Sequence, residues 1–218
     1  MITAKFSLGW LFAFLIVIPE YAPADTQNRI AKAPSESINK PRIETVVRIL
    51  DGDTYELADG KRVRLIGVDT PEKGEPFSDA ARDFVDSLLL GKDVNIEYDK
   101  LREDRYKRLL GYVFLDTIFI NELLISRGLA HVYLFKENKR YSRRLLQAQH
   151  QARERKRGIW SLIKPPDEPF YISAGGSYRF HRPLCTLIKN INPRKAVKFK
   201  SRDQALDKGL SPCRTCRP

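Results

Sequence analysis

The sequence has 218 residues, of which 42% are hydrophobic and 30% are charged, and its formal net charge is +12. This composition excludes an intrinsically disordered chain and indicates a folded protein of one or two domains. The positive charge favours a polyanionic partner, such as nucleic acid or an anionic membrane or wall, although a merely soluble basic protein would have the same charge.

The first 24 residues have the pattern of a secretory signal peptide. Lys5 precedes an apolar run at 6–18, and the small-residue motif Ala22-Pro23-Ala24 follows. The run is shorter than the roughly 20 residues that span a bilayer as a helix, so we expect cleavage after Ala24 and not a retained anchor. The sequence thus predicts a secreted or periplasmic protein with no stable membrane association after cleavage, beginning with a polar linker at 25–42.

Alternating hydrophobic residues and turn residues predict a β-rich domain over residues 43–162. The predicted strands cover residues 45–50, 54–57, 62–68, 94–98 and 109–115. The predicted helices cover residues 78–90, 121–127 and 141–157, with Ser78 as the first N-cap and Gly91 and Gly128 as helix ends. Five strands with a helix after the third are typical of an OB-type Greek-key barrel with flanking helices, an α+β fold.

Three carboxylates follow the turns of this predicted sheet. Asp53 ends the first turn, and Asp69 and Glu72 flank Thr70-Pro71 after the third strand. In a meander, the first turn and the end of the third strand can lie at the same end of the sheet. Two carboxylates and a backbone carbonyl there would suit an oxygen-preferring cation such as calcium. Taken singly, these motifs are also ordinary turns or helix starts.

Two arginines accompany these carboxylates. Arg64 lies in the otherwise apolar third strand, where a charge needs a partner, and Arg108 opens the last strand. Guanidinium groups near a metal could bind a phosphate bidentately and stabilise a five-coordinate transition state. A strand arginine alone is more often half of a buried ion pair.

In their order, these motifs resemble the staphylococcal nuclease family across residues 43–161. The resemblance is carried by the segments 49–54, 63–72, 104–109, 121–124, 128–130 and 158–160. It implies a calcium-dependent nuclease that cuts DNA and RNA between phosphorus and the 5′ oxygen and leaves 3′-phosphate ends, and the signal peptide predicts that this nuclease is exported.

The resemblance also implies roles for the acidic residues. Asp53 and Asp69 would bind calcium through their carboxylates, and Thr70 would bind it through its backbone carbonyl. Glu72 would orient or deprotonate the attacking water.

Among the basic and aromatic residues, the resemblance implies that Arg64 and Arg108 bind the scissile phosphate and stabilise the transition state. Arg105, Tyr106 and Tyr133 would contact the substrate. The sequence around Tyr133 and Phe135 is one residue short of the family pattern, and a lone aromatic is more often a core residue.

The sequence departs from the family at Lys107, where the family usually has glycine before the arginine. Lysine adds positive charge beside the phosphate, but it also replaces a flexible turn residue. The placing of Arg108 therefore depends on how this turn is made.

A second unit is predicted at 170–218, after a linker at 163–169. It contains all three cysteines of the chain, in the spacings His181-x3-Cys185 and Cys213-x2-Cys216. One imidazole and three thiolates suit a closed tetrahedral zinc site, and a unit of this size makes a poor core unaided. The rival is a Cys213–Cys216 disulfide, which an oxidising compartment favours.

This second unit resembles the zinc-binding domain of the Ada DNA-repair protein over about residues 171–218. In that family the first ligand is the cysteine that accepts a methyl group, whereas here it is His181. The resemblance therefore implies a structural zinc module without methyl transfer.

Two further hypotheses compete with an active nuclease, which we expect to be a monomer acting on DNA or RNA. The first is a non-catalytic nucleic-acid-binding protein built on a nuclease-type barrel. Such a protein would be expected to have lost site carboxylates or arginines, and none is missing here. The second, an extracellular adhesion or wall-binding role, leaves Asp53, Asp69 and Glu72 unexplained.

Overall fold

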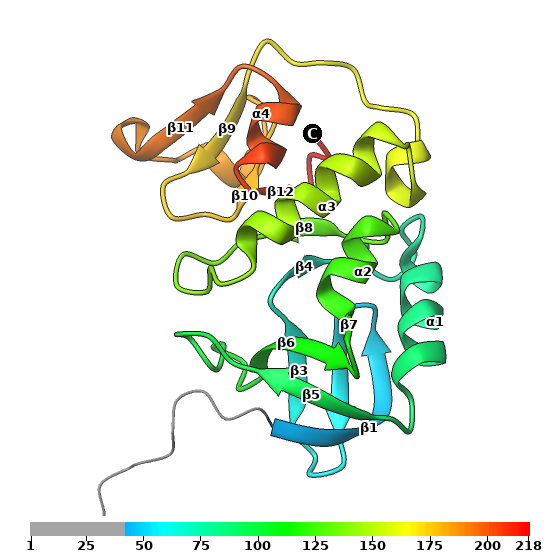
Figure 1. Cartoon of the computed structure of the whole chain (residues 1–218). Coiled ribbons are helices and arrows are strands. Elements are labelled where there is room, and N and C mark those ends of the chain that lie inside the picture. The colour runs from blue at the N-terminus through cyan, green and yellow to red at the C-terminus, as the bar shows by residue number, and fades with distance from the viewer. Residues whose placement is uncertain (1–41) are drawn as a thin grey trace, which may run out of the picture. The chain divides into compact units, whose positions relative to one another are not determined.

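The computed structural model describes residues 42–218 (Figure 1), so the predicted signal peptide and nearly all of the predicted linker at 25–42 lie outside it. The strands are β1 Arg42–Asp51, β2 Thr54–Leu57, β3 Arg62–Leu65, β4 Gly67–Asp69, β5 Asp93–Glu97, β6 Leu109–Leu115, β7 Ile118–Phe119, β8 His131–Tyr133, β9 Tyr171–Ala174, β10 Arg179–Phe180, β11 Ala196–Phe199 and β12 Ser211–Pro212. The α-helices are α1 Ser78–Leu89, α2 Ile120–Ser126, α3 Ser142–Glu154 and α4 Arg202–Asp207, and the 3₁₀ helices are η1 Gly158–Ser161, η2 Thr186–Ile188 and η3 Pro193–Lys195. Among the helices of residues 42–218, none is long and apolar enough to cross a membrane.

Five strands form a closed barrel. They are hydrogen-bonded in the order β3-β2-β1-β5-β6, and a parallel pairing of β3 with β6 closes the sheet on itself. β7 extends the sheet beyond β6. Fully buried side chains such as Val46, Leu65 and Val113 belong to the core that the barrel shares with the helices. The predicted five-stranded barrel with flanking helices is therefore confirmed.

The strand predicted at 62–68 is in fact two strands. Gly67 has a φ of +77°, which glycine adopts without strain but which interrupts a regular strand. β3 therefore ends before it, and β4 leaves the barrel to pair with β8, where Asp69 lies opposite His131. The expectation of one continuous strand is wrong, and the break carries Asp69 beyond the barrel rim.

Helix α1 begins where the sequence predicts, but its N-cap is Phe77 and not Ser78. Phe77 has a left-handed backbone, and Ser78 is the first helical residue, with a buried hydroxyl that does not cap the helix. The prediction fails because the chain enters the helix through a tight turn, in which the Ser78 N–H donates to the carbonyl of Glu75. The helix buries Ala81, Val85 and Leu89, as its periodicity predicts.

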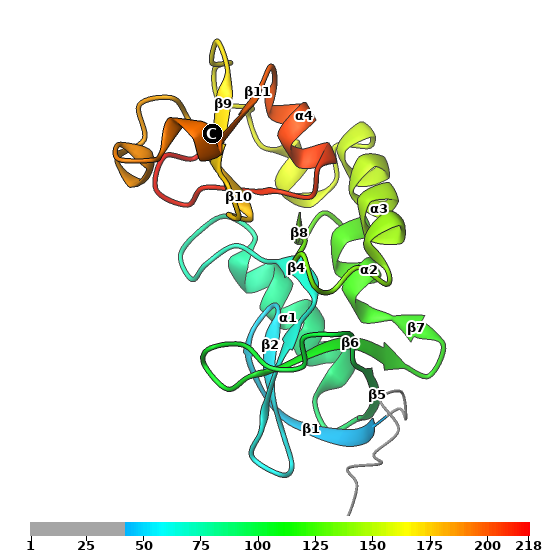
Figure 2. The same ribbon diagram turned by 90° about the vertical axis from the view of Figure 1, so that its left-hand side faces the viewer.

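Helices α2 and α3 lie side by side next to the barrel (Figure 2). Asn121 of α2 is fully buried and ties the helix to the barrel: its Oδ1 accepts from Val113 N at 2.9 Å and its Nδ2 donates to Ile66 O at 2.8 Å. α3 ends earlier than the predicted residue 157, because the chain turns at Lys156, whose φ is 50°.

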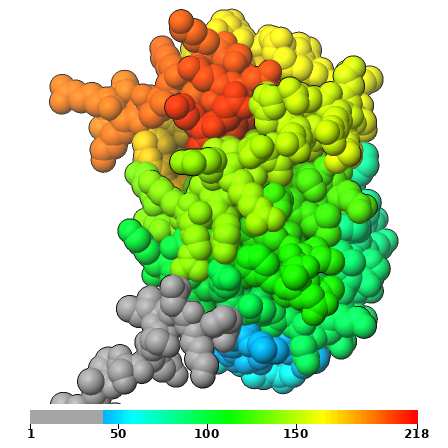
Figure 3. Space-filling model, in the orientation of Figure 1, coloured from blue at the N-terminus to red at the C-terminus, as the bar shows by residue number. Residues whose placement is uncertain are grey.

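Residues 170–218, called here the C-terminal segment, form two small sheets, β9 with β11 and β10 with β12. Its apolar residues Tyr171, Phe180 and Phe199 make a cluster separate from the barrel core. The segment contacts α3, where Gln149 Nε2 donates to Leu206 O at 3.2 Å. In Figure 3 its surface, orange to red, adjoins the yellow-green surface of α3 directly.

Candidate active site

The β1–β2 turn and the end of β4 meet, as the predicted meander requires. The backbone N–H and the hydroxyl of Thr70 donate to Asp53 Oδ2 at 3.0 and 3.1 Å. The approach is close: a Cβ on Gly52 would lie 2.8 Å from Thr70 Cγ2, so the turn requires glycine for space. Asp53 and Thr70 are both almost fully buried.

Arg64 lies between the two predicted calcium-binding carboxylates. Its Nη2 is 3.1 Å from Asp53 Oδ2 and 3.8 Å from Asp69 Oδ1, and its Nη1 donates to Leu65 O at 3.1 Å. The side chain is 8% exposed. Asp53 is thus the partner that the charge of Arg64 requires in an apolar strand. The arrangement places both carboxylates beside one guanidinium.

Asp69 has further partners that the sequence did not predict. Arg179 contacts both of its carboxylate oxygens at 3.0 Å, Arg214 Nη2 lies 2.7 Å from Oδ1, and the Ser211 hydroxyl donates to Oδ2. All three residues belong to the C-terminal segment. No sequence motif points to them, because they are separated from Asp69 by more than a hundred residues and Arg179 and Arg214 stand among many other arginines.

The two carboxylates differ electrostatically. Burial raises the pKa of Asp53 to about 6, against the opposing effect of Arg64. Burial also disfavours ionisation of Asp69, but the guanidiniums of Arg179, Arg214 and Arg64 outweigh it and lower the pKa of that carboxyl below its usual value. Asp69 is therefore the more firmly ionised of the pair.

Arg108 is held by a neighbour in its own loop. Its Nε donates to Asp104 Oδ2 at 2.8 Å, and its Nη1 lies 3.5 Å from the hydroxyl of Thr54, which in turn contacts Asp53. The preceding Lys107 has a φ of +63°. Lysine thus adopts a left-handed conformation that glycine adopts at less cost, and Arg108 follows directly after this residue.

The predicted substrate-contacting residues form two groups, one around Tyr106 and one around Tyr133. Arg105 and Arg108 flank the ring of the exposed Tyr106, with guanidinium carbons 4.8 and 5.4 Å from its centroid. Tyr133 packs edge to face against Phe135 and Tyr178, with centroids 5.2 and 5.5 Å away. Tyr133 is thus part of an aromatic cluster to which the C-terminal segment contributes Tyr178.

These residues line one cleft of about 950 Å³. From the barrel side they include Asp53, Arg64, Asp69, Thr70, Glu72, Arg105, Tyr106, Arg108 and Tyr133, and from the C-terminal segment Tyr178, Arg179 and Arg214. Every residue predicted for the nuclease site is therefore brought to the same cleft. The side chain of Glu72 is half-exposed there and pairs with Arg214.

The donor atoms fit a hard cation. Asp53, Asp69 and the backbone of Thr70 offer oxygen only, which calcium prefers to nitrogen or sulfur. The contacts of Asp53 and Asp69 with one Arg64 nitrogen put the two carboxylates close together. The guanidiniums on Asp69 are the feature that opposes a cation there.

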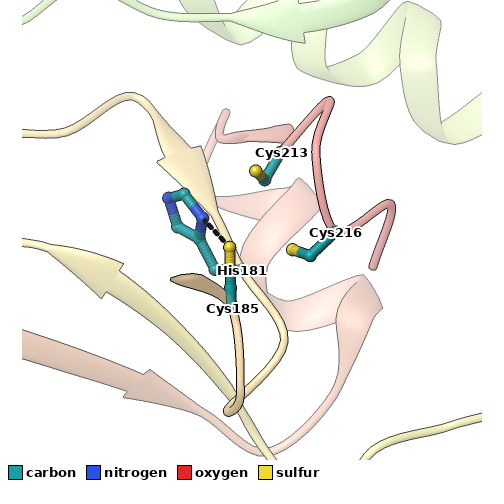
Figure 4. Close-up of side chains that lie close together, drawn as sticks. All are labelled: His181, Cys185, Cys213 and Cys216. Atoms are coloured by element: carbon teal, nitrogen blue, oxygen red, sulfur yellow. Dashed lines mark hydrogen bonds between the residues drawn. The ribbon is translucent and has the colours of Figure 1, made fainter. Parts of the chain in front are cut away.

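The predicted zinc ligands form a second cluster, in the C-terminal segment. The side chains of His181, Cys185, Cys213 and Cys216 converge (Figure 4), and their ligand atoms all lie within 4.8 Å of one another. His181 Nδ1 is 3.4 Å from Cys185 Sγ, and the three cysteines are free thiols. This donor set and spacing suit a tetrahedral zinc ion.

The acidity of the thiols in this cluster differs. Burial raises the pKa of Cys216 to about 12. Burial acts in the same direction on Cys213, but hydrogen bonds from the backbone of Cys216 and Thr215 outweigh it and lower the pKa of that thiol. The Cys213-x2-Cys216 turn thus already favours one thiolate, the form that binds metal.

Comparison with known proteins places the barrel in a family. The family described as staphylococcal nuclease homologue matches residues 62–162. A thermonuclease of Staphylococcus hyicus is 42% identical over 125 residues, which cover 53% of this chain and 74% of that protein. An uncharacterized endonuclease of Escherichia coli is 39% identical over 124 residues, covering 55% of this chain and 78% of that protein. The chain therefore belongs to the staphylococcal nuclease family, which confirms the expected class of nuclease-type hydrolase.

Proposed function

We propose that this protein is an exported, calcium-dependent nuclease that hydrolyses phosphodiester bonds of DNA or RNA to 3′-phosphate products. The observation that carries the proposal is the cleft in which Asp53, Asp69 and Arg64 are buried together, with Glu72 and Arg108 on its walls. The names of the related thermonucleases and endonuclease support the same chemistry.

In this proposal each residue has one role. Asp53, Asp69 and the Thr70 carbonyl would hold calcium, which would supply positive charge to the phosphate. Glu72 accepts a proton from the attacking water at a carboxylate oxygen, and the water oxygen bonds to phosphorus. Cleavage of the bond from phosphorus to the 5′ oxygen leaves a 3′-phosphate, and the departing oxygen takes a proton from solvent.

Arg64 and Arg108 donate hydrogen bonds to the non-bridging phosphate oxygens, where charge accumulates in the transition state. Arg64 is held rigidly by its buried contacts, whereas Arg108 reaches the phosphate by exchanging part of its pairing with Asp104. Arg105, Tyr106 and Tyr133 contact the neighbouring nucleotides.

The test is cleavage of plasmid DNA by purified residues 25–218, with calcium or with excess chelator. We expect cutting only with calcium, and end-group analysis should find 3′-phosphates.

Arg64→Ala and Arg108→Ala should each lower turnover by roughly 100- to 1,000-fold while lowering substrate affinity far less. The control Arg48→Ala removes an exposed arginine outside the cleft and should keep full activity. Undiminished cutting in chelator would refute the assignment.

The alternative function is a non-catalytic nucleic-acid-binding protein. It predicts DNA binding without cleavage in the same assay. The intact set of carboxylates and arginines around the cleft favours the enzyme.

We further propose that the C-terminal segment is a structural zinc module, with His181, Cys185, Cys213 and Cys216 as ligands, resembling the zinc-binding domain of the Ada protein. The convergence of one imidazole and three thiols supports it, with His181, Cys185 and Cys213 buried and Cys216 partly exposed. Elemental analysis should find about one zinc per chain. A Cys213–Cys216 disulfide without zinc, found by mass spectrometry, would refute it.

Export and the domain boundaries complete the proposal: a signal peptide at 1–24, linkers at 25–42 and 163–169, a nuclease domain at 43–162 and a zinc domain at 170–218. N-terminal sequencing of the exported protein should begin at Asp25. A retained Met1 would show that the signal acts as an anchor.

A further inference from the structure

The C-terminal segment reaches into the nuclease cleft through two arginines. Arg179 is bidentate on Asp69, with two contacts of 3.0 Å, and Arg214 adds a third at 2.7 Å. Arg214 also pairs with Glu72 through its other terminal nitrogen. One predicted calcium ligand and the predicted general base are thus both held by residues outside the barrel.

The arginines are fixed in place by the frame of the C-terminal segment. Arg179 is the first residue of β10, opposite Ser211 of β12, and its Nη1 also donates to Pro212 O at 2.8 Å. Its guanidinium covers the ring of Tyr133, 5.1 Å from the centroid. β12 lies beside β8 in Figure 1, next to the β4 strand that carries Asp69.

Both arginines are also next to the predicted zinc ligands in the chain. Arg179 precedes His181 by two residues, and Arg214 lies between Cys213 and Cys216. The Cys213–Cys216 turn is closed by a hydrogen bond from Arg217 N to Cys213 O at 2.9 Å. The turn that brings the thiols together therefore also sets where Arg214 points.

The position of these charges has a direct chemical consequence. A calcium ion bound to Asp69 would lie within a few ångströms of two guanidiniums that bind the same carboxylate oxygens, and like charges at that distance repel. The ion must therefore compete with Arg179 and Arg214 for Asp69. A carboxylate that two guanidiniums already pair with, besides Arg64 of the barrel, is a weaker calcium ligand than a free one.

We infer that Arg179 and Arg214 are positioning residues of the nuclease site, which hold Asp69 and Glu72 and thereby raise the calcium concentration at which the site fills. The inference rests on the proposed calcium site. It assigns the C-terminal segment a role in setting the calcium affinity of the barrel's site, in addition to any contact with substrate.

The test measures calcium affinity directly, without substrate, by isothermal titration calorimetry on the full-length chain. Arg179→Gln and Arg214→Gln should each tighten calcium binding by about tenfold or more, and the double variant should tighten it further. The control Arg194→Gln removes an exposed arginine of the same segment and should leave the affinity unchanged. Zinc content and circular dichroism verify that each variant is folded.

The direction of the effect separates this role from a merely structural one. A variant that only loosens the fold would weaken calcium binding or leave it unchanged, whereas release of Asp69 strengthens it. Arg179→Lys keeps the charge but loses the bidentate contact, so its affinity should lie between those of the unmodified chain and Arg179→Gln. If Arg179→Gln does not fold, Arg214→Gln, whose side chain is 38% exposed, remains as the test.

Two failures are distinguishable. Calcium binding that depends on Asp69, as Asp69→Asn would show, but has the same affinity in folded arginine variants would overturn this inference alone. Absence of calcium binding in the unmodified chain and in all variants would overturn the proposed calcium site together with it.

Discussion

Lys107 shows at the scale of one residue how this chain makes a left-handed turn without glycine. Its φ of +63° is a conformation in which Cβ crowds the backbone of an L residue. The hydrogen bonds that hold the loop compensate: Asp104 Oδ1 accepts from Tyr106 N at 2.8 Å and from Arg108 N at 3.1 Å. The Asp104 carboxylate therefore fixes the turn and, through its other oxygen, Arg108.

Lys107→Gly should raise the free energy of unfolding by about 0.5–1 kcal/mol, because it removes the left-handed strain at the expense of some backbone entropy. Urea denaturation monitored by fluorescence measures the change. The control Lys189→Gly replaces an exposed lysine with an ordinary helical φ of −53° and should destabilise. Equal effects of the two substitutions would show that the turn at Lys107 carries no strain.

The site residues differ in how far the sequence could predict their surroundings. A charge in the apolar third strand required a partner, and Arg64 indeed pairs with Asp53. The pairing of Asp69 with Arg179 could not be predicted, because it joins residues 110 positions apart and depends on how two separate apolar clusters pack. The local sequence pattern identifies site residues within one sheet. It does not identify contacts that form when the C-terminal segment packs against the barrel.

At the scale of elements, the strands β2 and β6 have the predicted bounds because alternation and turn residues define both of their ends. The break at Gly67 was missed because its apolar neighbours continue the strand pattern on both sides, although an isolated glycine in such a pattern often marks a bulge or a bend. The break depends on a long-range pairing: with its φ of +77°, Gly67 turns the chain so that β4 leaves the barrel and pairs with β8. A Cβ at Gly67 would also lie 2.5 Å from Leu145 Cδ1 of α3.

Two glycines join α2 to the turn after α3. A Cβ on Gly128 would lie 2.1 Å from Arg157 O, and a Cβ on Gly158 would lie 2.1 Å from Gly128 O. The same contact includes a hydrogen bond from Ile159 N to Gly128 O at 2.8 Å. This explains physically why the two motifs that begin with these glycines belong together.

Gly128→Ala and Gly158→Ala should each destabilise the protein by at least about 2–3 kcal/mol, because the backbones cannot separate without losing that hydrogen bond and both residues have positive φ. Thermal unfolding measures the loss. The matched control is Gly60→Ala, which has a φ of +80° but no atom within 4 Å of the added Cβ. It should cost only the backbone strain, about 1 kcal/mol. A loss as large at Gly60 would show that packing is not the cause.

At the scale of the whole molecule, the C-terminal segment combines a small apolar cluster with the proposed zinc site. Its docking on the barrel side includes Leu134 N donating to Gly209 O at 3.0 Å and ion pairs of Arg153 with Asp203 and Asp207. The barrel has its own, much larger core. Stability of the barrel should therefore not depend on the metal.

Cys213→Ser should release zinc and unfold the C-terminal segment, since metal binding supplies much of the folding free energy of so small a unit. Calcium-dependent cutting of short oligonucleotides should survive. Hydrogen exchange checks this by showing lost protection in residues 170–218 with protection of β1–β6 retained. The control Lys208→Ala removes an exposed side chain of the same segment and should keep the zinc. Loss of protection in the barrel as well would show that the two parts fold as one unit.

The net charge of +12 predicts how the molecule binds long nucleic acid. Neutralising a phosphate with an arginine or lysine releases condensed counterions, so the logarithm of the affinity falls linearly with the logarithm of salt concentration, with a slope of about −0.9 per phosphate contacted on duplex DNA.

Arg105 lines the cleft and is exposed, whereas Arg48 lies outside the cleft and pairs with Glu56. Arg105→Gln should therefore reduce the slope by about one and Arg48→Gln should not change it. Fluorescence anisotropy between low and moderate salt measures both slopes, in a Glu72→Gln background so that the DNA stays intact. An affinity that does not change with salt would mean that phosphate contacts do not drive binding, and would point instead to a wall or protein partner.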